Sequence, residues 1–195
     1  MIRFMTATLH NNILKFMVTG GVLTQGVRAG AEAFTEGELR AGIEEAHKAD
    51  KLTAAHVQGL AGIKNASCAG IDTIEHGAFD TWDEEALDPL QSRWLVPTFA
   101  APDGILSGTG TLPECIISNT EPVAAKHQEN TAAAHQFSIR IVAGTDAGTP
   151  FNPHGNLPWE LELLSRVGLS HLEVLRSATT VASEALNLTG QVGTL

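Results

Sequence analysis

The chain has 195 residues, of which 43% are hydrophobic, and it carries a formal net charge of −10 at pH 7 with a pI near 5.1. A chain of this length and apolar content can bury one sizeable core, so we expect residues 1–195 to form a single domain. The acidic charge and the lack of a basic cluster argue against nucleic acid or an anionic membrane as partner, and no apolar run approaches the roughly 20 residues that span a bilayer.

From the N-terminus, strand-like and helix-like patterns alternate. The apolar run ILKFMV predicts a strand over residues 13–18, and a Gly-rich loop follows it. A helix is predicted from about Thr35 to Asp50, because the Thr35 hydroxyl can cap its first turn while Glu38 reaches back. The next predicted elements are a strand over 52–56, a short helix over 58–69 and a strand over 70–76.

The second half of the chain continues this alternation. A second Thr-x-x-Glu pair, Thr81 and Glu84, predicts the start of a helix that runs to about Gln91. The segment WLVPTF predicts a strand over 94–99, and a long loop rich in Pro and Gly is expected after it. The remaining predicted elements are a helix over 117–137, a strand over 138–144 and two or three helical segments within 157–187.

Strands that alternate with helices predict an α/β fold in which helices cover a parallel sheet. Gly20 and Gly21 do not match the GxGxxG fingerprint of a dinucleotide-binding sheet. Five strands could form an open doubly wound sheet or part of a (β/α)8 TIM barrel. A complete barrel typically has ~250 residues, so 195 residues are few for one.

Four side chains that could bind a metal ion each stand at the end of a predicted strand: Lys15, His56, His76 and Asp146. In a parallel β/α array the C-terminal strand ends share one face, so these residues converge although they are distant in sequence. A set of one lysine, two histidines and one aspartate on that face indicates a metal-dependent hydrolase. Thr98 ends another strand on the same face and is expected to line the pocket without binding metal.

Each of the four residues also has a simpler interpretation. Lys15 in a strand covered on both faces needs an anion or a chemical modification, unless its stem lets the ammonium reach solvent. His56 and His76 could be hydrogen-bonded structural histidines, although their equivalent positions on successive strands favour a shared site. Asp146 could bind a cation and accept a proton from water, or could form an Asx-turn or cap a helix.

The remaining histidines carry weaker signals. His154, in the loop PFNPHGN, is expected either to contact substrate or to lie on the loop surface. Four others fall in helical stretches with polar neighbours and are predicted to face solvent: His47, His127, His135 and His171.

Cysteine usage and the N-terminus indicate a cytoplasmic protein. Cys68 and Cys115 have neither the spacing of a metal-binding pair nor a disulfide framework. The segment MIRFMTATLHNN, residues 1–12, has no apolar stretch after its basic residue and so lacks the layout of a signal peptide.

Taken together, the segments LKFMVTGGV, AAHVQG, AGIDTIEHG, LVPTF, IVAGTDAGTP and HGNLPWELELL resemble the metal-dependent amidohydrolase superfamily, and in particular its prolidase-like and imidazolonepropionase-like members. Such enzymes are (β/α)8 barrels with a small β-sandwich. The resemblance implies that Lys15 matches the strand-4 lysine that CO2 carboxylates and that bridges two metal ions. It also implies that His56 and His76 match the strand-5 and strand-6 ligands, and Asp146 the strand-8 aspartate.

The sequence also departs from the family pattern. Family members begin with a His-x-His pair on strand 1, and this sequence contains no His-x-His. Strands 1 to 3 and the final part of the β-sandwich have no counterpart, so we expect a partial barrel with strands 4 to 8 and flanking helices, truncated at both ends. Its two open sheet edges favour pairing with another chain, so a homo-oligomer is expected.

The resemblance implies a hydrolase of amide or other C–N bonds in a small, dipeptide-like substrate. One or two divalent ions, with zinc implied, would activate water, Asp146 would accept its proton and pass it to the leaving amine, and His76 or His154 would orient the carbonyl or a substrate carboxylate. Two alternatives stay open. One is a lactonase or phosphotriesterase on the same scaffold, and the other is a non-catalytic remnant, or a subunit that needs a partner to supply strands 1 to 3.

Overall fold

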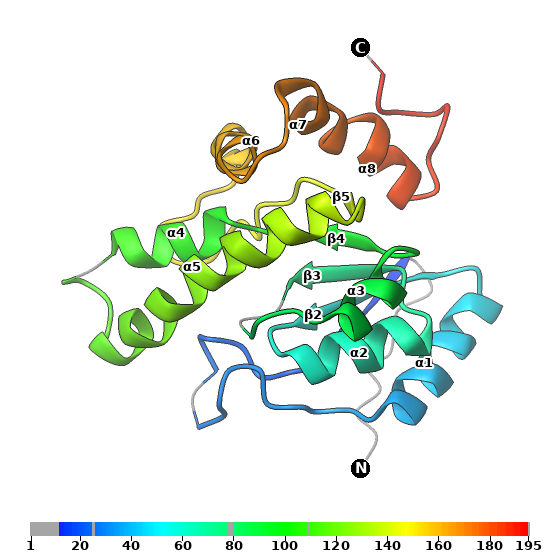
Figure 1. Ribbon diagram of the computed structural model, residues 1–195, viewed down its shortest axis with the longest axis horizontal. Helices are drawn as coiled ribbons and strands as arrows, with labels where there is room; N and C mark the ends of the chain where they lie inside the picture. Colours follow the sequence, from blue (N-terminus) through cyan, green and yellow to red (C-terminus); the bar gives the residue numbers. More distant parts are fainter. Residues whose placement is uncertain (1–11, 25, 78–79, 109, 195) are drawn as a thin grey trace.

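The computed structural model describes residues 12–24, 26–77, 80–108 and 110–194 (Figure 1), so all but the last residue of the segment 1–12 lies outside the described residues. Five parallel strands form one sheet in the order β1-β2-β3-β4-β5. Their bounds are β1 Ile13–Met17, β2 Leu52–Val57, β3 Thr73–His76, β4 Trp94–Val96 and β5 Arg140–Ile141. The predicted α/β fold is confirmed, and the sequential order of the parallel strands is that of part of a (β/α)8 barrel.

Helices connect the strands and continue beyond the last one. In Figure 1, α1, α2 and α3 lie side by side along one side of the sheet, and α6, α7 and α8 follow β5. Within the described residues, no helix is both long enough and apolar enough to cross a membrane. The bounds are α1 Glu36–Lys48, α2 Leu60–Ala69, α3 Glu84–Leu90, α4 Ala100–Ser107, α5 Glu114–Gln136, α6 Leu157–Arg166, α7 His171–Ser177 and α8 Thr180–Ala185.

The helix starts show how far the local sequence predicted the capping residues. The Thr35 side chain accepts a hydrogen bond from the Glu38 backbone while the Glu38 carboxylate accepts one from the Thr35 backbone, so the predicted capping box of α1 is confirmed. The cap predicted at Thr81 is wrong. Asp83 caps α3 instead, because its carboxylate accepts a hydrogen bond from the Ala86 N–H at 2.9 Å.

The strands β4 and β5 are shorter than predicted. Pro97 directly follows β4 and has no N–H to donate to a sheet, and Thr98 has a φ of +62°, which no strand residue adopts. The sequence places a loop after residue 99, and this prediction is wrong because α4 begins at Ala100. Pro102 is compatible with that helix, since proline is tolerated in a first helical turn.

The sheet packs one face against the helices. Ala55, Ile74 and Leu95 are in register on β2, β3 and β4, and all three are fully buried. They join Ile43 of α1 and Ile63 of α2 in the main hydrophobic cluster. Burying one such branched aliphatic side chain stabilises the fold by about 1.5–3 kcal/mol, so this face holds the sheet in place.

The opposite face divides into an apolar part and an open part. Trp94 and Val96 of β4, and Val142 directly after β5, form a small cluster with Ala185 of α8. On β1, by contrast, Ile13 and Met17 are 40% and 49% exposed. The open part of this face therefore lies along β1, because Ala54 and His56 of the neighbouring β2 are buried.

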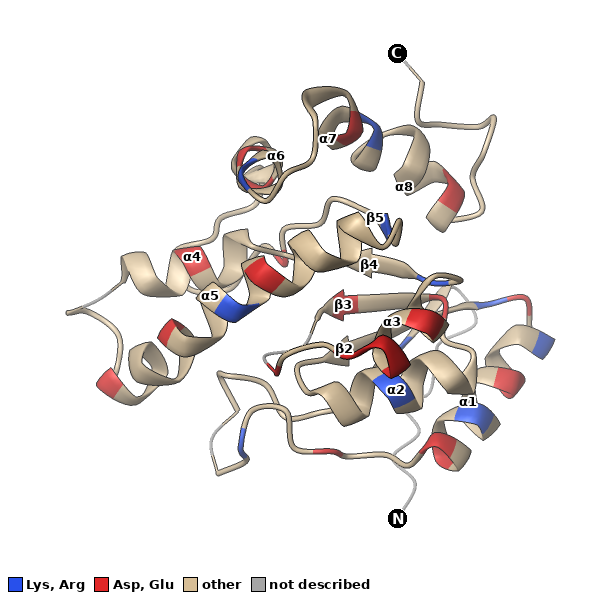
Figure 2. Cartoon of the chain, viewed as in Figure 1, with Lys and Arg blue, Asp and Glu red and all other residues tan. Residues whose placement is uncertain are grey.

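Charged side chains lie mostly on the helices (Figure 2). The strands carry only three of them in the described residues, Lys15 on β1, Glu75 on β3 and Arg140 on β5. Of these, Arg140 stacks its guanidinium over the Trp94 ring at 3.7 Å. Lys15 and Glu75 remain as the strand charges nearest the candidate site.

Candidate functional site

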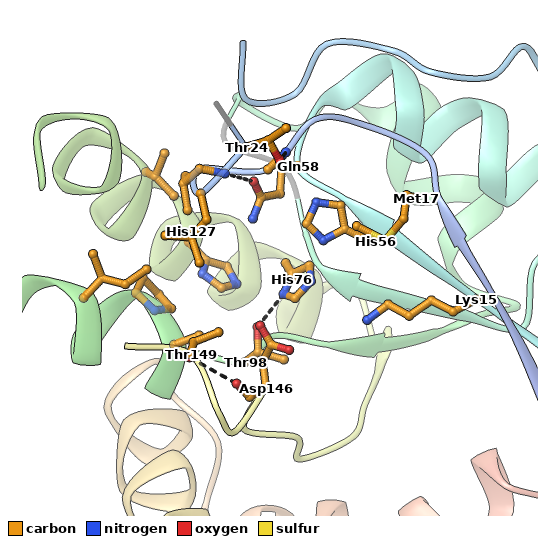
Figure 3. A pocket seen from close by; sticks show the side chains of 17 residues that line it. Lys15, Met17, Thr24, His56, Gln58, His76, Thr98, His127, Asp146 and Thr149 are labelled. Carbon is orange, nitrogen blue, oxygen red and sulfur yellow. Dashed lines mark hydrogen bonds between the residues drawn. The ribbon is translucent and has the colours of Figure 1, made fainter. Parts of the chain in front are cut away.

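A cavity of about 270 Å³ lies at the C-terminal ends of the strands (Figure 3). Its wall brings together all four side chains predicted to bind metal, and Thr98 with them: Lys15, His56, His76, Asp146 and Thr98. His154 is not among the lining residues and lies exposed on the loop after β5. Contact of His154 with substrate therefore stays a prediction.

His56 and His76 form the centre of the cavity wall. Their ring centroids are 4.6 Å apart with the planes at 68°, and the two residues are only 9% and 6% exposed. Burial, and then the positive charge of Lys15, lowers the pKa of His56 to about 4. Burial also lowers the pKa of His76 well below its ordinary value, with smaller contributions from His56, Lys15 and His127. Both imidazoles are therefore neutral near pH 7, which is the form that binds a metal ion.

The Nε2 atoms of both rings are buried and have no hydrogen-bond partner. Buried polar atoms are nearly always satisfied in native proteins, so such an atom indicates a ligand or a solvent molecule at that place. Gly21 leaves room beside one of them, because a Cβ at this position would come within 3.0 Å of His56 Nε2. The donor atoms and the space beside them fit a bound metal ion.

The proton on His76 can be assigned from its neighbour Thr98. The Thr98 hydroxyl has one proton and donates it to the carbonyl oxygen of Pro97, which can only accept. The 2.7 Å contact between His76 Nδ1 and Thr98 Oγ1 is therefore a hydrogen bond that Nδ1–H donates. This tautomer leaves the Nε2 lone pair of His76 free to face the cavity.

Three of the cavity residues have left-handed backbone conformations. The φ angles of His76, Thr98 and Asp146 are +74°, +62° and +50°. His76 ends β3, Thr98 lies shortly after β4, and Asp146 lies in the loop that follows β5. Such angles are rare outside glycine, above all for a β-branched residue such as Thr98. They cost of order 1–3 kcal/mol each and persist only where surrounding contacts hold them. Three of the candidate side chains thus enter the cavity from backbone positions that neighbouring contacts must hold.

Lys15 differs from the expectation of burial. Its side chain is exposed, as are those of Ile13 and Met17 on the same face of β1. None of the ion pairs among the described residues includes it. In Figure 3 its side chain extends toward the space beside His76 and Asp146. The sequence argument assumed a covered lysine that needs an anion, and it therefore does not apply here. The amine of Lys15 can reach solvent.

Asp146 stands in a turn that is fixed through its backbone. Its carbonyl oxygen accepts hydrogen bonds from Thr149 Oγ1 and from the Asn152 side chain, both at 3.1 Å. Asn152 is buried and also donates to the Thr145 carbonyl at 2.6 Å. The Asp146 side chain is exposed at the cavity. The turn thus presents a carboxylate whose backbone is held in place, and Asn152 is a supporting residue that the sequence analysis missed.

His127 contradicts its prediction as a solvent-facing histidine. It is 3% exposed, lines the cavity from α5, and packs its ring against Phe99 with centroids 4.6 Å apart. Burial lowers the pKa of His127 to about 4, although the backbone groups of His76 and Pro97 oppose the shift. Its Nε2 is the third buried imidazole nitrogen at this cavity without a hydrogen-bond partner. The other three helical histidines are exposed or half-buried, as predicted: His47, His135 and His171.

The cavity does not contain a complete set of ligands for a metal ion. Within the described residues, no three His, Cys, Asp or Glu side chains lie close enough to hold one together. The two imidazoles therefore fit a metal ion as a pair, with Lys15 and Asp146 at the rim of the same cavity.

Comparison with known proteins relates the chain to one family. Residues 7–195 match the amidohydrolase family. Ochratoxinase from Aspergillus niger is 28% identical over 191 residues, which cover 92% of this chain and 38% of that enzyme. An uncharacterised protein of Mycobacterium tuberculosis is 33% identical over 154 residues, or 76% of this chain and 40% of that protein.

Solved structures give the same result. A Xaa-Pro dipeptidase with methionine bound in its active site superposes with a TM-score of 0.85 at 28% identity, over 94% of this chain and 45% of the dipeptidase. The structure of A. niger ochratoxinase superposes with a TM-score of 0.78. The chain thus spans less than half the length of the proteins that it resembles.

Proposed function

The chain belongs to the amidohydrolase family, and on this premise we propose that it supplies the metal-binding part of an active site that hydrolyses amide or other C–N bonds in small molecules. The observation that carries the proposal is the pair of buried, unpartnered Nε2 atoms of His56 and His76, on adjacent strands of one cavity. Lys15 and Asp146, which complete the predicted set, border the same cavity.

His56 and His76 are the residues that would hold a divalent ion such as zinc, which binds neutral imidazole through bonds of ~2.0–2.1 Å. Such an ion supplies an activated water and polarises a carbonyl. Lys15 would add an anionic ligand if its free amine attacks CO2, forming an N–C bond and losing a proton. This reaction needs an accessible amine, and the exposed side chain of Lys15 satisfies that requirement.

The chain's own residues account for proton transfer and for substrate placement. The Asp146 carboxylate is exposed to the cavity, so its oxygens can take a proton from water and return it to the leaving amine. Apolar side chains, including Met17, Ile105 and Val123, line the remaining wall and suit the uncharged part of a small amide. We propose that the substrate is such a small amide. The similar Xaa-Pro dipeptidase is named for substrates of this kind, which are dipeptides.

Hydrolysis of a panel of N-acyl amino acids and dipeptides in the presence of zinc tests this function. Replacing Asp146 by Asn preserves size but removes the proton acceptor, so kcat should fall by about 10²–10⁴-fold while KM changes little. Asp88→Asn, on the exposed surface of α3, is the matched control and should leave both constants unchanged. An Asp146→Asn enzyme with the wild-type kcat would remove Asp146 from the mechanism. Zinc uptake without hydrolysis of any substrate in the panel would favour the non-catalytic alternative.

A further inference from the structure

Glu160 occupies an unusual position for a carboxylate. Among the Asp, Glu, Lys and Arg side chains of the described residues it is the only buried one, with no exposed surface. It lies in the first turn of α6, on the same helix face as the core residues Leu163 and Leu164. A buried carboxylate is costly unless several hydrogen bonds compensate for lost water, so its partners indicate its role.

Those partners are two consecutive backbone amides some 60 residues away in sequence. Glu160 Oε1 accepts a hydrogen bond from the Phe99 N–H at 3.0 Å, and Oε2 accepts one from the Ala100 N–H at 2.7 Å. Both amides belong to the N-terminus of α4, where the helix dipole favours an anion. Burial raises the pKa of Glu160 to about 7, while the amides of Ala100, Phe99 and Thr98 oppose that shift.

These two hydrogen bonds fix the peptide planes on either side of Phe99, directly after the strained Thr98. A β-branched residue at a φ of +62° would relax unless neighbouring contacts held it. The hydroxyl oxygen of Thr98 in turn accepts a hydrogen bond from His76 Nδ1–H, with Nδ1 and Oγ1 2.7 Å apart. A continuous chain of contacts therefore runs from Glu160 through the backbone at residues 98–100 to the imidazole of His76.

We propose that Glu160 is a positioning residue for His76. By holding the backbone that places the Thr98 hydroxyl, it keeps His76 protonated on Nδ1 and directs the Nε2 lone pair into the cavity. The consequence for metal binding rests on the proposed function, in which His76 is a ligand. The assignment of the tautomer does not, because it follows from the contacts of His76 and Thr98 alone.

The direct test is the protonation state of the His76 ring, measured by ¹⁵N NMR of the imidazole in metal-free protein. The wild-type chain should show the Nδ1–H tautomer. Glu160→Gln keeps the length of the side chain but offers one acceptor and sets an NH2 group against a backbone N–H, so His76 should become a mixture of tautomers. Glu162→Gln, on the same helix but paired at the surface with Arg166, is the matched control and should leave the ring unchanged.

Zinc titration gives a second readout. Loss of a partner that orients a metal ligand typically weakens affinity by about 10–100-fold, so Glu160→Gln should bind zinc more weakly by about that factor. Thr98→Val removes the intermediate hydroxyl and should have the same effect. Because both substitutions break one chain of contacts, the double variant should be no weaker than Thr98→Val alone.

The outcomes separate this inference from the proposed function. A wild-type His76 protonated on Nε2, or a folded Glu160→Gln chain with an unchanged tautomer and unchanged zinc affinity, would overturn it. If Glu160→Gln does not fold, Glu160→Asp takes its place. Aspartate keeps both acceptors on a stem one methylene shorter, and the His76 tautomer and the zinc affinity of this variant are compared with those of the wild type. The tautomer is measured without metal or substrate. Failure of the hydrolase proposal would therefore leave this result standing, and failure here would leave hydrolysis untouched.

Discussion

The buried ring of His127 makes the stability of the chain depend on pH. Its pKa is lowered to about 4 by burial, whereas the same histidine in an unfolded chain titrates near 6.5. Between these two values the unfolded state binds a proton that the folded state does not. Stability is therefore complete above about pH 6.5 and falls as the pH drops from there toward 4.

The size of the effect follows from the two pKa values. At pH 5 the unfolded histidine is nearly fully protonated and the folded one is not, which lowers the free energy of unfolding by about 2 kcal/mol relative to neutral pH. Glu160 acts in the opposite direction, because its pKa is raised to about 7 in the fold and its protonation stabilises the folded chain as the pH falls. His56 and His76, whose pKa values burial also lowers, act in the same direction as His127. The total pH dependence therefore has several contributions, and a variant is needed to isolate that of His127.

His127→Gln removes the titrating group and preserves a polar side chain of similar length. The free energy of unfolding of metal-free wild type and variant is measured in urea at about pH 7.5 and about pH 5. The difference between the two proteins should change by about 2 kcal/mol from one pH to the other. His171→Gln, on the surface of α7, controls for the loss of an imidazole as such. Parallel pH profiles for wild type and His127→Gln, or the same change in the control, would refute the argument.

Two glycine substitutions test close contacts at the site. Gly21→Ala sets a methyl group 3.0 Å from His56 Nε2, where a metal ion must fit, so zinc affinity should fall by about 10-fold or more in a titration. Gly104→Ala sets a methyl group 2.8 Å from the Pro150 carbonyl oxygen. This overpacking should lower the free energy of unfolding in urea by about 1–3 kcal/mol. Gly37→Ala in α1 meets no atom within 4 Å and is the control for both, so equal behaviour of the three variants would contradict these contacts.

The sequence predicted the residues that depend on strand order. His56 and His76 each lie at or near the end of an apolar strand, with a glycine within the next three residues. Their place on adjacent parallel strands put them on one face without knowledge of the packing. The same reasoning brought Lys15 and Asp146 to that face. It could not give the burial of Lys15, because burial depends on what covers β1 and not on β1 itself.

Two residues whose role the sequence analysis missed, His127 and Glu160, stand on helices. His127 has the polar neighbours Lys126 and Gln128, yet it shares the buried face of α5 with Val123 and Ala134 at helical spacing. The helical spacing of these residues is visible in the sequence. However, a helix face that mixes Thr, Asn and His with apolar residues is not apolar enough to be told from a solvent-facing one.

Glu160 raises the same difficulty and a second one. Its spacing to Leu163 and Leu164 places it on the buried face of α6, which is a signal for a carboxylate with fixed partners. Those partners are backbone amides at the start of α4, a helix that Pro102 and Gly104 hid in the sequence. Every residue except proline has a backbone N–H, so the amino-acid sequence does not show which N–H groups bind a carboxylate.

Zinc binding by the metal-free chain tests the central claim most directly. Isothermal titration of the wild type should show uptake of at least one zinc ion per chain, and the double variant His56→Gln/His76→Gln should lose it. The variant His47→Gln, whose ring pairs with Asp72 away from the cavity, should bind as the wild type does. A wild-type chain that takes up no zinc, or a double variant that binds it as tightly as the wild type, would contradict the assignment of this cavity as a metal site.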